Sequence, residues 1–371
     1  MSNLVLYRKY RPQTFSEIIG QEHVIQTLTN AISQGMTSHA YIFSGPRGSG
    51  KTTIARLLAK AINCHNRKEG QAEPCNQCSS CLEIKNGNSM DLIEVDAASH
   101  RGIDEIRELR EGIKFSPAKE KYKVFIIDES HQLTREAANA LLKTLEEPPS
   151  HAIFILATTE IHKMIPTIVS RCQRFDFRRL TLPEIVKRLE IVSQKEKADI
   201  EKPALELIAL SSSGSIRDAE GLLDQVLTFS GTSGKQVIKV DDIKDLLGLT
   251  DTAQIAQFLD FLSEKNRKGA IDFLEDIFGK GADPQEFAKA LIQYLRQSLL
   301  LKINPHPQNP LIVGLTKEEQ EKMRNQIKGL SSSEIQKILN VFLEAERKIK
   351  YSSIPQLPLE LAIVDIIPEQ G

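Results

Sequence analysis

The chain has 371 residues, and 48 Lys and Arg against 49 Asp and Glu give a formal net charge of −1. This balance excludes a wholly basic, histone-like binder but leaves room for a local basic face. Trp is absent and aromatic residues make up 5%, which disfavours a base-stacking platform. No apolar run approaches the roughly 18 residues of a membrane span, and the N-terminus lacks a signal-peptide core. We therefore expect a cytosolic protein of two or three domains, whose five cysteines are metal ligands or free thiols.

Five short apolar runs lie in the first 180 residues, with helical patterns between them. Most are continuous and β-branched, which is typical of strands buried on both faces of a parallel sheet. The runs are 41–44, 91–96, 123–128, 152–157 and a weaker one at 174–177. Only helical patterns follow after residue 180. The sequence therefore predicts an α/β domain, with a parallel sheet and helices on both faces, followed by all-helical parts.

A glycine-rich loop follows the first predicted strand and precedes a helical pattern. It reads Gly45-Pro46-Arg47-Gly48-Ser49-Gly50-Lys51-Thr52 and matches G-x-x-x-x-G-K-[ST]. In such a loop backbone N–H groups surround a phosphate, the lysine reaches the β- and γ-phosphates, and the threonine hydroxyl binds Mg²⁺. The residues predicted to bind nucleotide are Gly45, Gly48, Ser49, Gly50, Lys51, Thr52 and Thr53.

An acidic pair, Asp128-Glu129, ends the third predicted strand. In P-loop enzymes a strand-end aspartate supports Mg²⁺, and a neighbouring glutamate polarises the water that attacks the γ-phosphate. The alternative is an acidic cap for the next helix. Because the pair shares a sheet with the phosphate loop, we favour catalysis and predict hydrolysis as well as binding.

Three further polar groups have two possible roles each. Thr158-Thr159 ends the fourth strand, which in such sheets can lie between the phosphate-loop strand and the acidic strand. A hydroxyl there could contact the γ-phosphate or satisfy local backbone. Arg171 and Arg217 could each stabilise phosphate charge, in cis or from a neighbouring subunit. A single arginine is, however, more often a surface group.

Four cysteines follow the spacing C-x10-C-x2-C-x2-C: Cys64, Cys75, Cys78 and Cys81. Two chain segments that supply four thiolates suit a closed, tetrahedral, structural Zn²⁺ site. Iron–sulfur ligation and four free thiols are the alternatives. The fifth cysteine, Cys172, is expected to be a packed thiol.

Together these motifs resemble those of bacterial DNA polymerase III subunit gamma/tau, the AAA+ ATPase family of the replicative clamp loader. The resemblance extends from about Leu6 to at least Asp224 and returns at 357–362. It rests on Tyr7-Arg8-Lys9-Tyr10-Arg11-Pro12, the phosphate loop, Asp128-Glu129-Ser130-His131, 141–149, Ala157-Thr158-Thr159, Ser170-Arg171-Cys172 and Gly214-Ser215-Ile216-Arg217-Asp218. The family usually has valine where this chain has Ser130.

The resemblance implies three domains and a set of residue roles. It implies an AAA+ domain at 1–179 with a zinc module at about 64–81, a helical lid at 180–243 and an all-α collar for oligomerisation at 244–368. Thr159 would be sensor 1, Arg171 the arginine finger acting in trans, and Arg217 the sensor-2 arginine. The residues implied near adenine and ribose are Tyr7, Arg11, Pro12, Ile18 and Ile19.

The implied cofactors are ATP, Mg²⁺ held by Thr52 and Asp128, and Zn²⁺ held by the four cysteines. The implied partners are the clamp-loader subunits delta and delta-prime, further copies of the chain, the sliding clamp beta and primer-template DNA, with no membrane. ATP binding would open the clamp, and hydrolysis triggered by DNA would release it closed, within a DNA polymerase holoenzyme at the replication fork in the cytoplasm. The tau form of the family carries further C-terminal domains. As this chain stops at Gly371, we expect loader activity without their tethering function.

DNA contacts would be to the backbone, since no base-reading motif is present. The candidate residues are Arg101, Arg107, Arg110, Lys114 and Lys143. The alternative is a solvated helix face, because acidic residues alternate with the first four and Glu147 follows Lys143 at i+4. A second functional hypothesis is another AAA+ machine, such as a branch-migration motor, although it would lack the zinc insert and collar.

Overall fold

The computed structural model describes residues 4–99, 111–231, 237–246, 252–303 and 317–367. The chain divides into two compact units. The first comprises residues 1–198 and 211–225, and the second comprises 199–210 and 226–371. None of the helices among the described residues is both long enough and apolar enough to span a bilayer.

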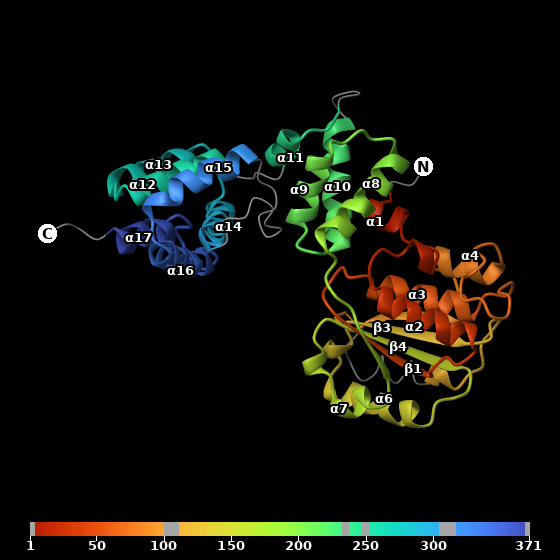
Figure 1. The fold of residues 1–371 in the computed structure, drawn as a ribbon. Helices are drawn as coiled ribbons and strands as arrows, with labels where there is room; N and C mark the ends of the chain where they lie inside the picture. Colours follow the sequence, from red (N-terminus) through yellow and green to blue (C-terminus); the bar gives the residue numbers. More distant parts are fainter. Residues whose placement is uncertain (1–3, 100–110, 232–236, 247–251, 304–316, 368–371) are drawn as a thin grey trace. The chain divides into compact units, whose positions relative to one another are not determined.

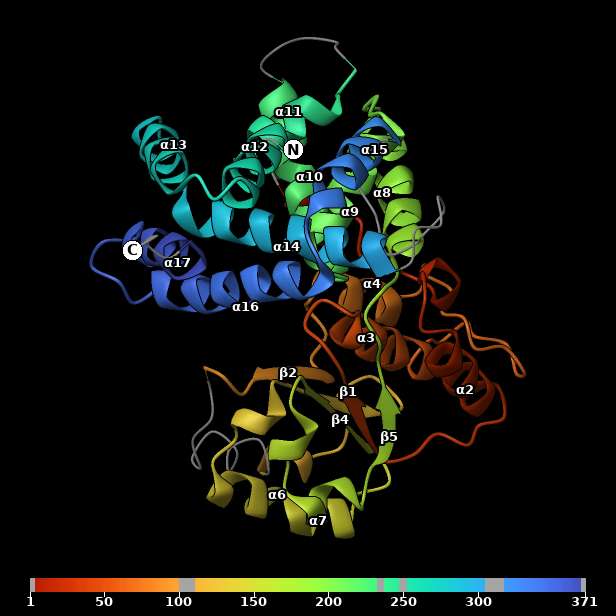
Figure 2. The same ribbon diagram turned by 60° about the vertical axis from the view of Figure 1, so that its left-hand side comes forward.

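A five-stranded parallel sheet lies at the centre of the first unit (Figures 1 and 2). Its strands are β1 (Ala40–Ser44), β2 (Leu92–Asp96), β3 (Lys123–Asp128), β4 (Ala152–Thr158) and β5 (Gln173–Asp176). The strand order is β2-β3-β4-β1-β5. The fourth strand therefore lies between the phosphate-loop strand and the acidic strand, which confirms that expectation. Ser44 is in register with Thr158, so the two strands end at the same edge of the sheet.

Helices cover both faces of the sheet, as predicted. Helices α2 (Glu22–Ser33) and α3 (Lys51–Ile62) cover one face, and α6 (Arg135–Glu146) and α7 (Pro166–Val169) cover the other (Figure 1). Along β1, Tyr41 and Phe43 pack into the first core while Ala40 and Ile42 pack into the second. A strand with cores on both faces must be apolar throughout, which explains the continuous runs.

Burial on both faces does not hold for the two outer strands. Within β2, Leu92, Ile93 and Val95 are half-buried and the acidic residues are exposed, and β5 buries only Phe175. Both lie at the ends of the strand order, so each has a neighbour on one side only.

The remaining elements of the first unit connect or flank the sheet. They are α1 (Leu6–Lys9), η1 (Phe15–Glu17), α4 (Ser79–Asn86), η2 (Ser130–Gln132), η3 (Ile161–Lys163), α8 (Leu182–Glu196) and the first part of α10 (Ile216–Gly231). Helix α8 begins with a capping box, in which Thr181 and Glu184 satisfy each other's backbone N–H groups.

Among its described residues the second unit is helical, apart from an isolated parallel β-bridge between Ile200 and Ile238. Its helices are α9 (Lys202–Ser211), α11 (Val240–Leu246), α12 (Thr252–Ser263), α13 (Arg267–Gly279), α14 (Pro284–Ile303), α15 (Lys317–Gln326), η4 (Ile327–Gly329), α16 (Ser332–Ile349) and α17 (Leu357–Ile366). Helices α14 and α16 pack side by side (Figure 2). Phe258 lies at the centre of this core, with ring contacts to Phe273, Phe287 and Phe342. The all-helical prediction for this part is confirmed.

Candidate nucleotide-binding site

The glycine-rich loop connects β1 to α3 and folds around its own backbone. Gly48 has a φ of +73° and Gly50 a φ of +99°, which glycine adopts without a steric penalty. A Cβ at Gly48 would also collide with the side chain of Ser215. Ser49 Oγ donates to the carbonyl of Pro46 at 2.8 Å and closes the turn. The loop therefore presents the N-terminus of α3, with its free N–H groups, to the pocket beside it.

Lys51 lies across this loop. Its Nζ donates to the carbonyl oxygens of Gly45 and Pro46 at 2.7 and 2.9 Å, and the residue is only 5% exposed. Burial lowers the pKa of Lys51, while the charges of Glu129 and Asp128 oppose that shift. Gly45 itself does not line the pocket, although its carbonyl holds the lysine.

The acidic pair meets the loop at the carboxyl edge of the sheet. Thr52 Oγ1 donates to Asp128 Oδ2 at 2.7 Å, so the two oxygens predicted to hold Mg²⁺ are already adjacent. A hydroxyl and a carboxylate are oxygen ligands of the kind Mg²⁺ prefers, and the two residues fit that ion. Glu129 follows with a φ of +46°, an uncommon conformation outside glycine, and its N–H donates to Asp128 Oδ1.

The end of β4 reaches the same glutamate. Thr159 Oγ1 donates to Glu129 Oε2 at 3.0 Å, whereas Thr158 is fully buried. The Thr158 hydroxyl lies 3.0 Å from His131 Nδ1 and accepts from the N–H of Glu160. His131 is 3% exposed, and its ring nitrogens lie 3.5 Å from Glu129 and 3.4 Å from Glu160. The sequence had assigned no role to His131.

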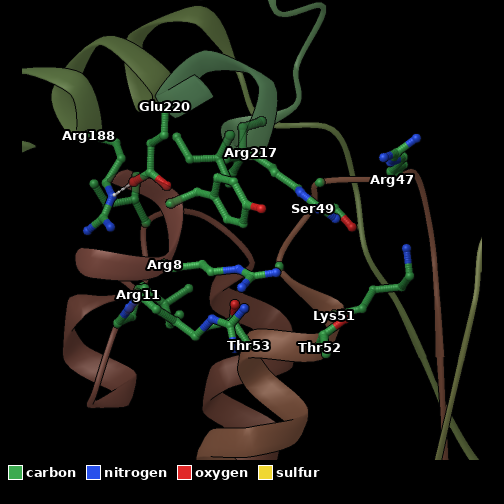
Figure 3. Close-up of a pocket in the computed structure, with 18 of the residues that line it drawn as sticks. Arg8, Arg11, Arg47, Ser49, Lys51, Thr52, Thr53, Arg188, Arg217 and Glu220 are labelled. Atoms are coloured by element: carbon green, nitrogen blue, oxygen red, sulfur yellow. Dashed lines mark hydrogen bonds and ion pairs between the residues drawn. The ribbon is translucent and has the colours of Figure 1, made fainter. Parts of the chain in front are cut away.

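The phosphate loop and the acidic pair border a pocket of about 350 Å³, whereas Thr158, Thr159 and His131 do not line it (Figure 3). The lining residues come from the N-terminal segment, the phosphate loop with α3, the acidic pair, and the helices that follow β5. They are Tyr7, Arg8, Arg11, Pro12, Glu17, Ile18, Ile19, Arg47, Gly48, Ser49, Gly50, Lys51, Thr52, Thr53, Asp128, Glu129, Leu180, Arg188, Ile216, Arg217 and Glu220. Residues predicted from four distant motifs thus line one cavity.

Arg217 joins the helical part of the first unit to the N-terminal segment. Its guanidinium lies 4.8 Å from the centre of the Tyr7 ring. A hydrogen bond from Arg217 lowers the pKa of Tyr7, with burial opposing the shift. Beside it, the N–H of Ile216 donates to the carbonyl of Gly48 at 3.2 Å, so the start of α10 is also tied to the phosphate loop.

A buried ion pair forms part of the pocket lining. Arg188 Nε donates to Glu220 Oε1 at 2.7 Å, and both side chains are less than a tenth exposed (Figure 3). Arg188 also donates to the carbonyl of Tyr10. Burial raises the pKa of Glu220, although Arg188 opposes this, and burial lowers the pKa of Arg11 nearby.

Arg171 does not line the pocket of its own chain. It lies just after α7, where Nη2 pairs with Glu146 Oε1 at 2.6 Å and Nη1 donates to the carbonyl of Thr167. Its side chain remains 33% exposed. Cys172 beside it is half-buried, and burial raises the pKa of its thiol to about 12.

The four cysteines converge after α3. Their sulfur atoms lie within 4.8 Å of one another, and Cys75 Sγ is 3.9 Å from Cys81 Sγ. A tetrahedral ion with Zn–S bonds of ~2.3 Å holds its sulfurs about 3.8 Å apart. Such spacing leaves room for one ion, not for a cluster of several irons. The thiols therefore fit a single Zn²⁺ ion.

Backbone donors around these sulfurs support the same interpretation. Burial opposes ionisation of Cys75, but N–H groups of Gln77 and Cys78 donate to its sulfur and lower its pKa to about 6. Burial raises the pKa of Cys64 and of Cys81. A cation among the four sulfurs would offset the cost of ionising these buried thiols.

The basic residues predicted to face DNA have different outcomes. Arg101, Arg107 and Arg110 lie outside the described residues. Lys114 is exposed and pairs with Glu111 at 2.8 Å, which agrees with the solvated-face alternative. Lys143 is exposed, and none of the ion pairs found among the described residues joins it to Glu147, which follows α6.

Sequence reasoning missed several residues of the pocket wall. Glu17, Arg188 and Glu220 belong to no motif with a fixed spacing to the phosphate loop, and Arg8, although part of the N-terminal motif, had been given no role. Arg188 and Glu220 lie on two helices that follow the sheet. Their helical patterns gave no signal that these charged positions face inward. An arginine on the buried side of α8, next to Leu189, was the one available hint.

Three family models match consecutive segments of the chain. Residues 20–181 match the DNA polymerase III delta subunit, and residues 184–232 match the ATPase lid domain of the DNA polymerase III clamp loader subunit. Residues 238–369 match domain III of DNA polymerase III subunits gamma and tau.

Curated relatives match along almost the whole chain. DNA polymerase III subunit tau of Bacillus subtilis is 44% identical over 99% of this chain and 63% of its own length. Subunit tau of Escherichia coli is 35% identical over 98% of this chain and 55% of its own length. Subunit gamma of Buchnera aphidicola from Acyrthosiphon pisum is 37% identical over 99% of both chains. The chain thus spans somewhat over half of each tau relative.

A solved structure shares the fold. The Thermotoga maritima RuvB Holliday junction branch migration motor aligns with 69% of this chain and 80% of its own, at 21% identity and a TM-score of 0.50. At that identity the likeness shows the shared fold alone. The family models and the match to an entire gamma subunit decide the family: the chain belongs to the gamma/tau subunits of DNA polymerase III.

Proposed function

We propose that the chain is an ATPase subunit of a bacterial replicative clamp loader. The observation that carries the proposal is the single pocket in which the phosphate loop, the acidic pair and Arg217 meet. Binding would exchange the contacts of Lys51 to loop carbonyls for contacts to phosphate oxygens. That exchange is favourable because the buried ammonium gains anionic partners.

Hydrolysis in this proposal uses groups that already contact one another. Thr52 and Asp128 would hold Mg²⁺, which supplies neutralisation of phosphate charge when bound. Glu129 accepts a proton from the attacking water as the new P–O bond forms and the bond to ADP breaks. Thr159, bonded to Glu129, would orient that carboxylate and contact the γ-phosphate as sensor 1. Arg217 would act as sensor 2.

The base would lie against the N-terminal segment. Tyr7, Arg11, Pro12, Ile18 and Ile19 line that part of the pocket. The predicted nucleotide-binding set of Gly45, Gly48, Ser49, Gly50, Thr52 and Thr53 would cradle the phosphates. The cysteines would hold Zn²⁺ as a structural module.

Arg171 would act on a neighbouring subunit. Its place after α7, outside its own pocket, supports this role. In a ring each arginine would complete the next site, so chemistry in one subunit depends on the position of another. The ring would include delta, delta-prime and further copies of this chain.

The work of the ring would be clamp loading. ATP binding would favour the ring shape that opens the sliding clamp beta, and primer-template DNA would trigger hydrolysis and release of the closed clamp. We assign an AAA+ domain to 1–179, a lid to 180–243 and a collar to 244–368. DNA would be held by its backbone, in the cytoplasm at the replication fork.

Steady-state ATP hydrolysis tests the proposal in four mixtures. These are the chain alone, with delta and delta-prime, with the clamp added, and with primed DNA added last. We expect a low rate that rises steeply only in the complete mixture. Strong hydrolysis by the chain alone, or stimulation by duplex DNA without partners, would instead favour a self-sufficient motor. Lys51→Ala, which should bind no nucleotide, is the negative control.

A further inference from the structure

The loop from Gln13 to Glu17 leads into Ile18 and Ile19 in the wall of the pocket, and two distant side chains hold it. Glu73 Oε2 accepts from the N–H of Phe15 and Oε1 accepts from the N–H of Ser16, both at 2.8 Å. These N–H groups begin the short helix η1 and have no carbonyl partner within it. A carboxylate that accepts both is well suited to fix the start of η1.

A second side chain holds Gln13, two residues before η1. Lys60 Nζ donates to Gln13 Oε1 at 2.7 Å, and Lys60 is only 2% exposed. Ala72, directly before Glu73, packs in the same core as Phe15 and the partly buried Ile18. Polar bonds and apolar packing therefore join the loop to the same neighbours.

Both side chains lie beside predicted zinc ligands in the sequence. Lys60 precedes Cys64 by four residues at the end of α3, and Glu73 precedes Cys75 by two. The N–H of Cys75 donates to Cys64 Sγ at 3.2 Å, so the segment that carries Glu73 is closed at its two ends by the thiol cluster.

We propose that the four-cysteine module positions the base-binding wall of the nucleotide pocket, with Glu73 as the positioning residue. The inference rests on the proposed nucleotide site and assigns its zinc module a task beyond local stability. The four cysteines would hold zinc and so close the 64–75 segment, that segment places Glu73, and Glu73 fixes the turn that presents Ile18 and Ile19. Without zinc, Glu73 would lose its fixed place and the wall would become mobile.

The test compares Glu73→Ala with Glu69→Ala, an exposed acidic residue of the same segment. Binding of a fluorescent ATP analogue to the full-length chain gives the affinity, and metal analysis gives the zinc content. We expect Glu73→Ala to retain zinc and to raise Kd for ATP roughly ten- to a hundredfold, since it removes two charged hydrogen bonds of a kind worth a factor of about ten each. Glu69→Ala should match the wild type.

Two further measurements separate positioning from a general loss of stability. Amide hydrogen exchange should accelerate at residues 15–19 in Glu73→Ala but not along β3. In the assembled loader, KM for ATP should rise while kcat changes less than about twofold. Glu73→Asp, which keeps both acceptor oxygens, should restore part of the affinity.

Removal of zinc from the wild type by a chelator should reproduce the faster exchange at 15–19 and the weaker binding. Unchanged affinity in both Glu73→Ala and the zinc-free chain would overturn the inference while the nucleotide site stands. A wild type that binds no ATP would instead overturn the proposed function. Full affinity in the zinc-free chain with weakened Glu73→Ala would overturn the role of zinc.

Discussion

Glu129 is restrained at both its backbone and its carboxylate. Its positive φ is a conformation that costs a non-glycine residue about 1 kcal/mol or more and is often found at functional sites. Its N–H donates to Asp128, and its carboxylate accepts from Thr159. The side chain is therefore held in place at the carboxyl edge of the sheet.

Glu129→Gln should separate binding from turnover. The amide keeps the shape and the bond from Thr159 but cannot accept a proton from water. We expect ATP affinity within about twofold of the wild type and turnover in the assembled loader reduced at least ~100-fold. Equilibrium binding and single-turnover hydrolysis measure the two quantities.

Thr159→Val provides the matched control, because it keeps the shape of the side chain and removes the donor. It should lower turnover less than Glu129→Gln. Wild-type turnover in Glu129→Gln would exclude this residue as the base and direct attention to the adjacent His131.

Arg217 is the second residue whose removal should have a specific effect. Arg217→Ala removes a charge from the pocket and the contact to the Tyr7 ring. We expect a roughly tenfold weaker Kd for ATP. Arg217 also lowers the pKa of Tyr7, so that pKa should rise in the variant.

Ultraviolet difference titration of tyrosinate follows that pKa shift, with Tyr7→Phe as the reference. Unchanged affinity together with a shifted tyrosine titration would mean that Arg217 packs against the N-terminal segment without contacting nucleotide.

Among the elements, features with a local sequence pattern were predicted, and features that depend on which elements pack together were missed. Strands β1, β3 and β4 were predicted because cores on both faces require continuous apolar runs. The exposure of β2 and β5 was not predicted, because the position of a strand at the edge of a sheet is set by strand order and not by composition. The phosphate loop and acidic pair have fixed spacings, whereas the pairing of Arg188 with Glu220 depends on how two helices pack.

The buried pair between α8 and α10 should be sensitive to loss of one partner. Glu220→Ala leaves the Arg188 guanidinium with little exposure and one carbonyl contact. Breaking such a pair costs about 3–5 kcal/mol. Urea unfolding of the full chain should show that loss in the transition that reports on the first unit.

Arg188→Met with Glu220→Leu tests whether the cost comes from an unpaired charge. The double variant removes both charges and should recover most of the stability. Equal loss in the single and double variants would place the cost in packing volume.

The capping box of α8 predicts a pH effect. Arg178 lowers the pKa of Glu184 to about 2 from its ordinary value near 4.5, with burial opposing and Thr181 adding to the shift. A carboxyl whose folded-state pKa is depressed stabilises the fold above its unfolded pKa. The contribution is then lost as pH falls toward the folded pKa.

Wild type should therefore exceed Glu184→Gln in unfolding free energy above about pH 5, and the difference should shrink as pH falls toward 2. Urea titrations at several pH values measure that difference, with Glu190→Gln on the same helix as control. A difference that is independent of pH would exclude the ionic contribution.

At the scale of the whole molecule, the role of Arg171 and the domain boundaries were predicted from resemblance alone. Nothing in the spacing of Arg171 indicates a role in trans, and a single chain has no neighbour to display it. The three domain boundaries likewise stay predictions, because the two compact units divide the helices after residue 198 differently. A sequence pattern identifies the chemistry of a local site, whereas the assembly of subunits depends on surfaces whose partners lie in other chains.

Arg171→Ala should therefore have no effect on the ATPase properties of the isolated chain. We expect unchanged ATP affinity and unchanged basal hydrolysis alone, and a loss of at least ~1,000-fold in the stimulated rate of the complete mixture. Arg174→Ala, an exposed arginine paired with Asp176, serves as control. A defect in the isolated chain would indicate that Arg171 supports folding through its bond to Glu146.

The segment from Thr159 to Arg171 has thirteen residues and a different environment at each end. At the N-terminal end, Thr159 bonds to Glu129 beside the chain's own pocket. At the C-terminal end, the partly exposed guanidinium of Arg171 pairs with Glu146, outside that pocket. Between them Met164 lies 3.5 Å from the hydroxyl of Ser130, the residue after Glu129. In the proposed ring this short stretch would make the assembly directional. Each subunit would couple the state of its own nucleotide to the site of one neighbour, and its own site would be completed by the other neighbour.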